Sequence, residues 1–362
     1  MQDLSFALED EVWAGLVARL GGAEALELSA REHGALLRKR GVKSAEDLLR
    51  LLLAYGPGGR SLRVTAAEAA ARGMSDISDV AWMKRFGQCG AWLTALCARL
   101  LAGADRPSAA GADAPAVRLV DGSRIAGPGD SCWRLHLCWD ASRRRIAQMK
   151  VTTLAEGERL DVLAPQAGEI RLGDCGFPQP NGLRTTRDAG ADVLVRLTWN
   201  SLRLLDAADR PLDWTALFAR CKTAGGLDIT VSVVKPRGRS EPLPLRLVIL
   251  PKPAEVVERA CRRARRAAAK EQRAVDPRSL ASAEHMILLT SLSVEAFPPD
   301  RLYDLYRVRW QIELAFKRLK SILRLDRLPA KSPGLAQAWI AAHLLIALLV
   351  EDTAAELAES FP

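Results

Sequence analysis

Aromatic residues are scarce in this chain, and its cysteines follow no metal-binding pattern. Phenylalanine, tryptophan and tyrosine together make up 5% of the 362 residues. A basic chain with so few aromatic side chains is poorly suited to binding sugars, which argues against a glycosidase that uses paired carboxylates. The seven cysteines form no C-x2-C pair and have no histidine partner at zinc-finger spacing. Metal sites built on cysteine are therefore not expected, and the odd number of cysteines predicts reduced thiols.

The sequence also lacks an export signal and a long apolar run. Its first residues, MQDLSFALEDEVW, contain neither a basic n-region nor an apolar h-region. The most apolar stretch, residues 336–350, is too short to span a bilayer and contains His343. We therefore expect a cytoplasmic protein with no membrane partner.

Positive charge is what the chain has in excess. Lysine and arginine number 52 against 43 aspartates and glutamates, which gives a net charge of +9 and a pI near 9.4. Such a surplus favours a polyanionic partner, with nucleic acid ahead of a membrane surface. Hydrophobic residues make up 49% of the chain and charged residues 26%, as in globular proteins. The length allows two or three domains with cores of their own.

The first 105 residues predict helices and no strands, because they are rich in alanine and leucine at helical spacing. Two short helices around Gly73, at 65–72 and 80–86, fit a helix-turn-helix that binds DNA, and they fit a plain helical bundle equally well. Residues 106–115 are small residues, glycine and proline, which predict a linker.

From residue 116 onward the pattern alternates between strands and helices, which predicts an α/β fold. Residues 116–199 predict three strands, a helix, and two more strands separated by a possible helix. Residues 200–284 predict two strands followed by an arginine-rich helix at 255–273. The expected strands are 116–120, 132–139, 146–153, 170–173, 193–198, 228–234, 244–250 and 285–292, and the expected helix after the third strand is 158–163.

Residues 298–324 predict one long helix that ends this alternating region. Two prolines stop any earlier helix, and apolar residues then recur at spacings of three and four. Beside this apolar stripe runs a second one that combines one acid with three cations and a phenol. A solvated helix with Arg–Glu and Glu–Lys pairs would be the ordinary explanation of such a stripe. Its members are Tyr306, Arg309, Glu313, Lys317 and Lys320.

Four of these residues, Tyr306, Arg309, Glu313 and Lys320, match the pattern Y-x2-R-x3-E-x6-K at every position. The pattern resembles the signature of DDE transposases of the insertion-sequence-four family. The resemblance implies a ribonuclease-H-like catalytic core interrupted by a β-rich insertion and preceded by an all-α N-terminal domain. The implied parts are the helical domain 1–105, the linker 106–115, the core 116–199 and 285–330, the insertion 200–284 and a C-terminal helical region 331–362.

The resemblance also assigns the catalytic work to three acids. Asp121, in AVRLVDGSRI, is expected at the end of the first core strand, and Asp174, in EIRLGDCGF, after the fourth. Glu313 is the acid on the helix. Taken singly, an aspartate before glycine is a common turn and an aspartate after a strand can cap a loop, so only the joint placement favours a site. The acids that compete with these are Asp113, Asp130, Asp140 and Asp188.

Three carboxylates from distant segments suit the chemistry of a phosphodiester. Hard divalent cations prefer carboxylate oxygen, and two Mg²⁺ ions can activate an attacking oxygen and stabilise a leaving one. The resemblance implies that two Mg²⁺ ions, for which Mn²⁺ can substitute, are bound by the three acids. It implies cleavage by water and then transfer of a DNA strand, in cut-and-paste transposition.

The partner that the resemblance implies is double-stranded DNA, both the terminal inverted repeats of an insertion sequence and the target. Arg309 and Lys320 are expected to grip phosphates, Tyr306 to contact the backbone, and Lys317 to have the same opportunity. A homodimer assembled on DNA is expected, in a bacterial protein associated with the nucleoid. The arginine-rich helix is either a solvated helix or a further DNA contact. Its candidate residues are Arg262, Arg263 and Arg266.

The chain departs from some members of that family at the start of the strand before the signature helix. Where they carry tryptophan, this chain has Met286, and a thioether stacks on a base less well than an indole. The sequence therefore leaves open whether cleavage passes through a DNA hairpin. Two other functions stay open as well: a helix-turn-helix regulator without catalysis, and a metal-dependent nuclease or inactive relic of the same fold.

Overall fold

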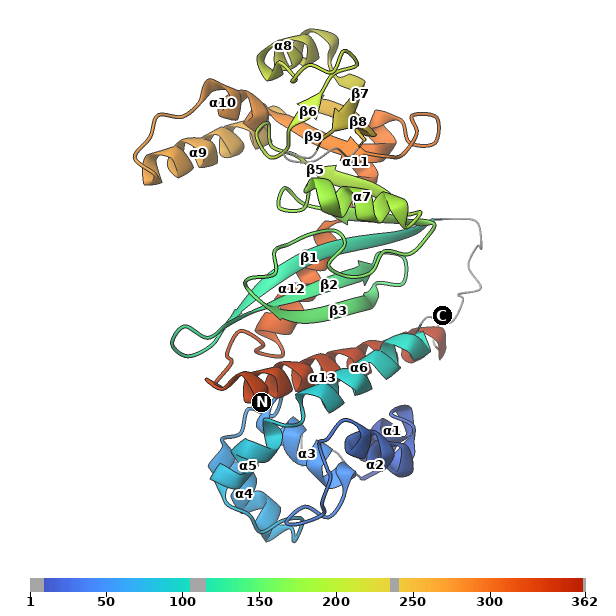
Figure 1. Cartoon of the computed structure of the whole chain (residues 1–362), viewed down its shortest axis with the longest axis vertical. Coiled ribbons are helices and arrows are strands. Elements are labelled where there is room, and N and C mark those ends of the chain that lie inside the picture. The colour runs from blue at the N-terminus through green and yellow to red at the C-terminus, as the bar shows by residue number, and fades with distance from the viewer. Residues whose placement is uncertain (1–9, 105–114, 235–240, 361–362) are drawn as a thin grey trace.

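In the residues that the computed structural model describes, 10–104, 115–234 and 241–360, nine strands form one mixed β-sheet (Figure 1). The strand order is β3-β2-β1-β4-β5-β9-β8-β7-β6. The strands β1, β4 and β5 are parallel, and every other neighbouring pair is antiparallel. The predicted α/β class is confirmed. The strands are β1 (Ala116–Ala126), β2 (Cys132–Asp140), β3 (Arg145–Thr153), β4 (Glu169–Gly173), β5 (Asp192–Arg196), β6 (Leu204–Leu205), β7 (Leu227–Val233), β8 (Leu243–Pro251) and β9 (His285–Thr290).

Strands from residues 200–284 extend the central sheet and do not form a sheet of their own. β9 pairs with β5 on one side and with β8 on the other, so β8, β7 and β6 continue the sheet outward. Three helices accompany these strands. They are α8 (Trp214–Ala224), which packs on β7 and β8, and the mutually packed α9 (Ala254–Lys270) and α10 (Pro277–Glu284).

β1 is longer than the predicted strand 116–120 because its two neighbours cover different lengths of it. β4 pairs with β1 only as far as Leu119, whereas β2 pairs with it as far as Ala126. Beyond Leu119 the hydrogen bonds to β2 keep the backbone extended. Asp121 therefore lies inside β1, at the point where β4 leaves it, and the prediction that it ends the strand is wrong.

The connection from β3 to β4 corrects another prediction. Residues 154–168, all of them described, form turns and bends, so the helix predicted at 158–163 is not present. The next connection, from β4 to β5, contains the helix α7 (Pro180–Asp188), where a helix or loop was predicted. This crossover joins two parallel strands, which a short turn could not do.

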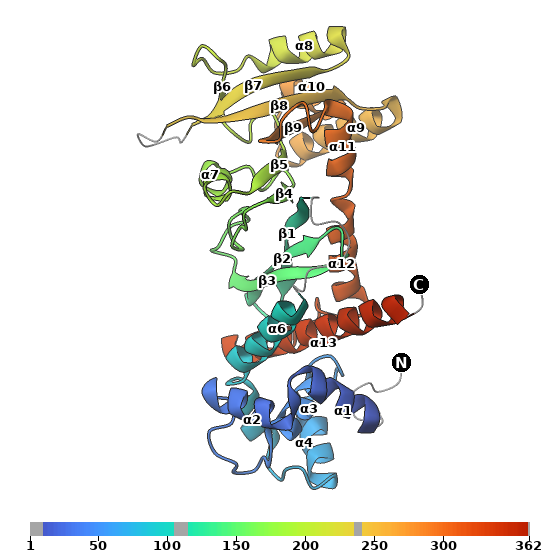
Figure 2. The same ribbon diagram turned by 90° about the vertical axis from the view of Figure 1, so that its right-hand side faces the viewer.

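Helices cover both faces of the sheet. Successive residues of a strand point to opposite faces. Leu119 belongs to the core on the face of α11 (Pro299–Arg307) and α12 (Trp310–Ser321), while Val120 belongs to the core that includes Leu183 of α7. Figure 2 shows α7 and α12 on opposite sides of the strands.

The helix predicted across 298–324 is divided into α11 and α12. Val308 and Arg309 lie between them with right-handed helical backbone angles, and their N–H groups bond to carbonyls three residues earlier. Such a 3₁₀ step tightens the chain without reversing it. The predicted apolar stripe still faces the sheet, because Ile312 and Phe316 are buried.

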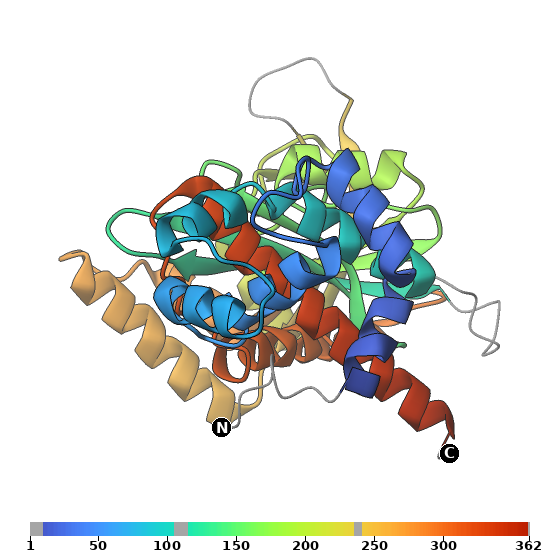
Figure 3. The same ribbon diagram turned by 90° about the horizontal axis from the view of Figure 1, so that it is seen from below.

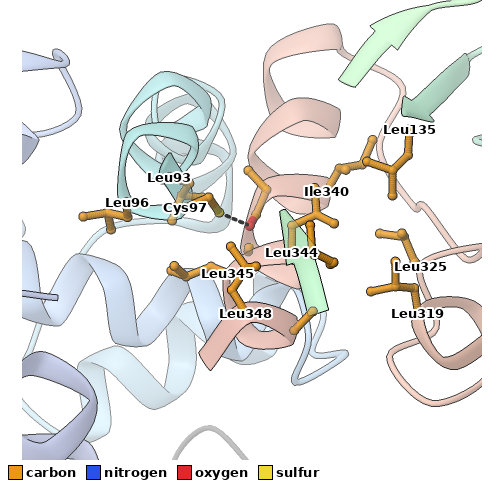
Figure 4. Close-up of a cluster of buried hydrophobic side chains, with 14 of the residues drawn as sticks. Leu93, Leu96, Cys97, Leu135, Leu319, Leu325, Ile340, Leu344, Leu345 and Leu348 are labelled. Atoms are coloured by element: carbon orange, nitrogen blue, oxygen red, sulfur yellow. Dashed lines mark hydrogen bonds between the residues drawn. The ribbon is translucent and has the colours of Figure 1, made fainter. Parts of the chain in front are cut away.

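Helices from the two ends of the chain are packed together. α13 (Pro333–Ser360) lies alongside α6 (Gly90–Ala104) in both side views. In Figure 4, Cys97 of α6 reaches the carbonyl of Ala341 in α13 at 3.7 Å, and Leu319 lies across α13 from α6. α13 thus joins the first helices to the sheet in one core. The earlier helices are α1 (Asp10–Arg19), α2 (Gly22–Glu32), α3 (Ala45–Tyr55), α4 (Leu62–Ala71) and α5 (Asp79–Phe86).

α13 is one helix and is longer than the apolar run 336–350. Its segment Pro333–Leu357 is long and apolar enough to cross a membrane, but 72% of its most apolar part is buried inside the protein. The apolar run 336–350, which was predicted to be too short to span a bilayer, is therefore part of a longer helix that packs inside the protein. Packing between α6 and the sheet accounts for the apolar composition of α13.

The pair of helices around Gly73 is α4 and α5, and α5 packs against α13. Whether this pair binds DNA stays a prediction. The linker predicted at 106–115 lies, apart from its last residue, outside the described residues.

A buried ionic network lies within the sheet. Arg171 of β4 is fully buried and donates five hydrogen bonds, to Glu169, to a glutamine and to three carbonyls of the loop 154–168. Arg118 of β1 pairs with Glu169 at 3.5 Å and with Asp140. A buried guanidinium is tolerated only when it is paired and its donors are used. The network therefore fixes the loop to β4.

We expect Arg171→Met to lower the free energy of unfolding by about 3–5 kcal/mol, because it removes one partner of a buried ion pair. Urea-induced unfolding followed by circular dichroism measures the change. The matched control is Arg210→Met, which breaks an exposed pair with Asp206 and should leave the unfolding midpoint nearly unchanged. Equal losses in the two variants would contradict a special role for the buried network.

Candidate active site

Asp121 and Asp174 lie on neighbouring parallel strands, just beyond the point where the pairing of these strands ends. The pairing of β1 with β4 ends two residues before each of them. In open α/β sheets, ligands bind where parallel strands end and diverge. Oδ1 of Asp121 accepts the N–H of Gly122 at 2.7 Å, and Oδ1 of Asp174 accepts the N–H of Gly176 at 2.8 Å. These bonds fix the direction of both carboxylates.

Glu313 comes to this edge from α12, and Arg309 connects it to Asp121. Nη2 of Arg309 pairs with Glu313, while Nη1 lies 3.7 Å from Oδ2 of Asp121. The start of α12 is held against β2 because the indole N–H of Trp139 donates to Gln311 at 3.2 Å. One guanidinium therefore bridges two of the three predicted catalytic acids.

The acids differ in their surroundings. The side chain of Glu313 is 58% exposed, whereas that of Asp121 is 18% exposed. Burial raises the pKa of Asp121 to about 6, and the nearby Asp174 adds to the effect, against a backbone hydrogen bond and Arg309, which oppose it. Burial alone would lower the pKa of Arg309, but its anionic neighbours raise it. Around the buried Asp121, carboxylates therefore outnumber the one nearby cation, Arg309.

A fourth carboxylate, that of Glu158, lies beside Asp174 and was not predicted. A methyl group on Gly176 would lie 3.1 Å from Oε2 of Glu158 and 3.3 Å from Oδ1 of Asp174, so both carboxylates face one small space. The other oxygen of Glu158 lies 3.6 Å from Nε of Arg134. Assigning 158–163 to a helix concealed this acid. Its place in the connection that leads into β4, the strand before Asp174, is the sequence signal that could have found it.

Comparison with known proteins identifies the family. Residues 113–349 match the family model described as a transposase DDE domain. The chain belongs to the DDE transposase family. The family assignment made from the Y-R-E-K signature is confirmed, and the names of the relatives are consistent with the insertion-sequence-four label.

Curated relatives resemble the chain over nearly its whole length. It is 40% identical to the putative transposase InsL for insertion sequence element IS186A of Escherichia coli (strain K12), over 94% of this chain and 93% of the relative. It is 39% identical to the transposase for insertion sequence element IS421 of Escherichia coli, with the same coverage. Among solved structures, the piggyBac transposase synaptic complex with hairpin DNA is similar at a TM-score of 0.46 and 8% identity, over 98% of this chain and 75% of that one.

DDE transposases cut and transfer DNA strands and generally use divalent metal ions. The side chains that could bind such an ion here are carboxylates. Within the described ranges, no three histidine, cysteine, aspartate or glutamate side chains are grouped closely enough to hold a metal ion. The donors fit Mg²⁺ in kind, because Asp121, Asp174 and Glu313 all offer carboxylate oxygen. Their arrangement does not fit a bound ion, because the carboxylate of Glu313 is paired with Arg309.

The other signature residues differ in exposure. Tyr306 is 7% exposed, its hydroxyl has no hydrogen-bond partner in the described part of the chain, and burial raises its pKa to about 12. Lys317 is exposed and Lys320 is half-buried, and neither forms an ion pair with a described residue. A contact from any of the three to DNA stays a prediction, and for Tyr306 it requires movement of neighbouring side chains.

The arginines predicted to bind DNA outside the signature lie on α9, which projects from the body of the molecule in Figure 3. Arg262, Arg263 and Arg266 are exposed, while Cys261 and Ala268 are buried on the other side of the helix. Arg262 pairs with a glutamate one turn earlier. α9 therefore presents a basic stripe to solvent.

The competing acids lie elsewhere. Asp140 is buried and pairs with Arg118. Asp130 lies in the exposed turn between β1 and β2, and Asp188 is exposed at the end of α7. Asp113 falls outside the described residues.

Two cations near the acids were not predicted. Arg196 ends β5, the strand beside β4, and Lys252 follows the end of β8. β5 and β8 run in the same direction, so both ends lie at the edge that carries Asp174. Burial, together with the nearby Arg196, lowers the pKa of Lys252 to about 8. Sequence spacing could not find them, because the pairing of β5, β9 and β8 is long-range.

We expect Tyr306→Phe to unfold at the same temperature as the wild type or a few degrees higher. A buried hydroxyl without a partner costs about 1–3 kcal/mol, and the substitution removes it. Thermal unfolding of the DNA-free chain measures the change. A clearly lower unfolding temperature would mean that the hydroxyl has a partner in solution.

Proposed function

We propose that this DDE transposase binds the terminal inverted repeats of an insertion sequence, cleaves DNA there and joins the ends to target DNA in cut-and-paste transposition. The observation that supports the proposal is that Arg309 lies between Asp121 and Glu313, while Asp174 follows the strand that pairs with β1. The family and its insertion-sequence relatives support the same function.

We assign the centre of the sheet to a ribonuclease-H-like core. Support comes from its order, in which β2 lies between β3 and β1, and β4 and β5 follow in parallel with β1 around α7. In this assignment 116–199 and 285–330 form the core, and 200–284 is the β-rich insertion between β5 and β9. Residues 10–104 of the N-terminal domain are helical wherever they have regular structure.

In the proposed reaction, Asp121, Asp174 and Glu313 hold two Mg²⁺ ions, for which Mn²⁺ can substitute. Bound there, the ions would activate the attacking oxygen and stabilise the leaving one. The chain's own task is to position the carboxylates. Backbone hydrogen bonds hold the two aspartates, and the more exposed Glu313 is free to rotate away from its helix partner.

Arg309 has two tasks in this proposal. In the DNA-free chain its guanidinium balances the charges of Asp121 and Glu313. On the complex it turns to a phosphate beside the cleavage site, with Lys317 and Lys320 as further contacts. A guanidinium suits both tasks, because its planar fork matches carboxylate and phosphate alike.

Glu313→Gln should abolish Mg²⁺-dependent cleavage of a labelled duplex that carries the element's end, while DNA affinity changes little. The amide keeps the shape of the side chain and removes the charge that binds the cation. Asp121→Asn and Asp174→Asn should behave in the same way. The matched control is Glu255→Gln, an exposed glutamate in the first turn of α9, which should cleave at the wild-type rate.

Gel assays of cleavage and of binding, run on the same variants, separate the alternatives. Binding without cleavage in the wild type, with or without Mg²⁺, would favour a helix-turn-helix regulator or an inactive relic. Cleavage without joining would favour a nuclease of the same fold. Cleavage by the Glu313→Gln variant would show that Glu313 is not a catalytic residue.

We propose that the basic stripe of α9 binds the DNA backbone. β8 ends at the same edge of the sheet as the acids, and α9 starts shortly after it. A strand of DNA lying on that edge could reach Arg262, Arg263 and Arg266. Backbone contacts of this kind release counterions and make affinity depend on salt.

Replacing Arg262, Arg263 and Arg266 by alanine should weaken DNA binding and reduce the slope of log affinity against log salt by about 3, close to 0.9 for each lost phosphate contact. Fluorescence anisotropy over a salt series measures the slope. The matched control replaces three exposed arginines elsewhere, Arg203, Arg210 and Arg220. Equal slopes in both triple variants would contradict the role of α9.

We propose that the active form is a homodimer assembled on two DNA ends in the bacterial nucleoid, because cutting and joining must be coordinated between ends. Met286 is half-buried in β9, at the position where some family members have tryptophan. A hairpin intermediate would therefore have a thioether in place of an indole at this position.

A further inference from the structure

Cations are concentrated in the segment that leads from the second half of α12 to α13. Residues 317–331 contain six lysines and arginines but one acid, in a chain whose net charge is +9. None of the six forms an ion pair with a described residue, although many arginines elsewhere are paired. Like charges that are not neutralised repel one another, so a polyanion would bind favourably here. The six cations are Lys317, Arg318, Lys320, Arg324, Arg327 and Lys331.

The backbone of this segment is fixed, although residues after α12 form no further regular helix until α13. Leu319, Leu325 and Leu328 are buried in the core that α12 and α13 share. The N–H of Leu325 donates to the carbonyl of Leu319 at 3.1 Å, and Leu328 packs against Gly127 in the turn between β1 and β2. The exposed cations that alternate with these leucines therefore have defined positions. They are Arg324, Arg327 and Lys331.

Arg324 occupies a backbone position that favours glycine. Its φ is 55°, in the left-handed region that commonly follows the last turn of a helix. A residue with a Cβ atom is strained there. The N–H of Leu323 bonds to the carbonyl of Arg318 at 3.3 Å, so the end of α12 is closed by the backbone and not by the Arg324 side chain. A strained and exposed arginine of this kind points to a role in binding.

The segment connects the acidic edge of the sheet with the N-terminal helices. At one end, Lys317 follows Glu313 by one turn of α12. At the other end, Lys331 lies three residues before Gly334, where a methyl group would collide with the carbonyl of Gly87 at the end of α5. Figure 2 shows α12 running along the sheet toward α13, with α3 and α4 on the far side of α13. A duplex that lies along this segment would extend from the acids toward α4 and α5.

We propose that Arg324, Arg327 and Lys331 bind the phosphate backbone of DNA on the element side of the cleavage site, between the acids and α5. The proposal rests on the proposed function, because it assigns a surface to the inverted-repeat DNA that enters the site. Guanidinium and ammonium groups both bind phosphate. In Figure 1, α9 and α13 lie toward opposite ends of the molecule, so this surface and the basic stripe of α9 would hold DNA on different sides of the acids.

Ordinary surface charge is the competing explanation. The three cations would then contribute to DNA binding no more than any three exposed arginines. A structural role would lower the unfolding temperature when they are replaced. A phosphate-binding surface predicts weaker DNA binding at an equal or higher unfolding temperature, because replacement relieves the repulsion among the cations.

The experiment measures binding of the full-length chain to two duplexes by fluorescence anisotropy over a salt series. Each duplex ends at the cleavage site; one extends only into the element and the other only into the flanking DNA. Replacing Arg324, Arg327 and Lys331 by alanine should reduce the slope of log affinity against log salt by about 3 on the element duplex. The slope on the flanking duplex should not change.

The matched control replaces the three exposed arginines 203, 210 and 220 by alanine and should leave both slopes unchanged. A single variant, Arg324→Gly, separates binding from stability. Glycine removes the strain at φ 55°, so the unfolding temperature should not fall, while the slope on the element duplex should decrease by about 1. Thermal unfolding of every variant shows that it is folded.

An unchanged slope on the element duplex in the folded triple variant would overturn the proposal. An equal loss in the control triple, or an equal loss on the flanking duplex, would overturn it as well. If the wild type binds and cleaves the element's end while the triple variant binds like the wild type, the proposed function stands and this inference fails. If the wild type binds neither duplex, the proposed function fails, and the inference fails with it.

Discussion

Carboxylates that repel one another are held in one small space, and much of the structure serves that requirement. Burial raises the pKa of Asp121, and Asp174 and Glu158 both add to this rise, which shows the repulsion between these carboxylates. Backbone hydrogen bonds orient both aspartates, Asp121 inside β1 and Asp174 in the turn after β4. Arg309 on one side and Arg134 on the other offset part of the repulsion. The remaining negative charge would favour a divalent cation at this edge, as the proposed function requires.

The same requirement explains why an arginine is fully buried in β4. A buried ion pair contributes little net stability compared with apolar packing, so Arg171 is better understood by what it holds in place. Its hydrogen bonds to the loop 154–168 keep that loop over the strand ends without a helix. Hydrophobic contacts could not do this, because they carry no direction, whereas five hydrogen bonds from one guanidinium define a position.

The parts of the site that were predictable from sequence are those encoded in one continuous stretch. The helical spacing predicted that Ile312 and Phe316 face the sheet, and both are buried. The signature singled out Glu313, which pairs with Arg309. The parts that were missed depend on pairing between distant segments. Asp121 lies inside β1 because β4 leaves it early, and Glu158 approaches the aspartates only because the loop is fixed by β4. No local pattern contains that information.

The direction of the strands also places cations next to the acids. A DNA strand that extends from the acids along this edge would pass over them. β4, β5 and β8 all end at one edge, so Arg196 and Lys252 follow Asp174 along it, and α9 continues beyond Lys252 with an exposed basic stripe. In the proposed function, the phosphodiester at the acids is neutralised by metal ions, and the flanking phosphates are neutralised by basic side chains along the same edge. Because antiparallel β9 separates β5 from β8, the insertion joins the sheet in the direction that keeps these cations on the acidic edge. A parallel β9 with the same pairing to β8 would put α9 at the opposite edge, so the proposed DNA path depends on the orientation of the insertion.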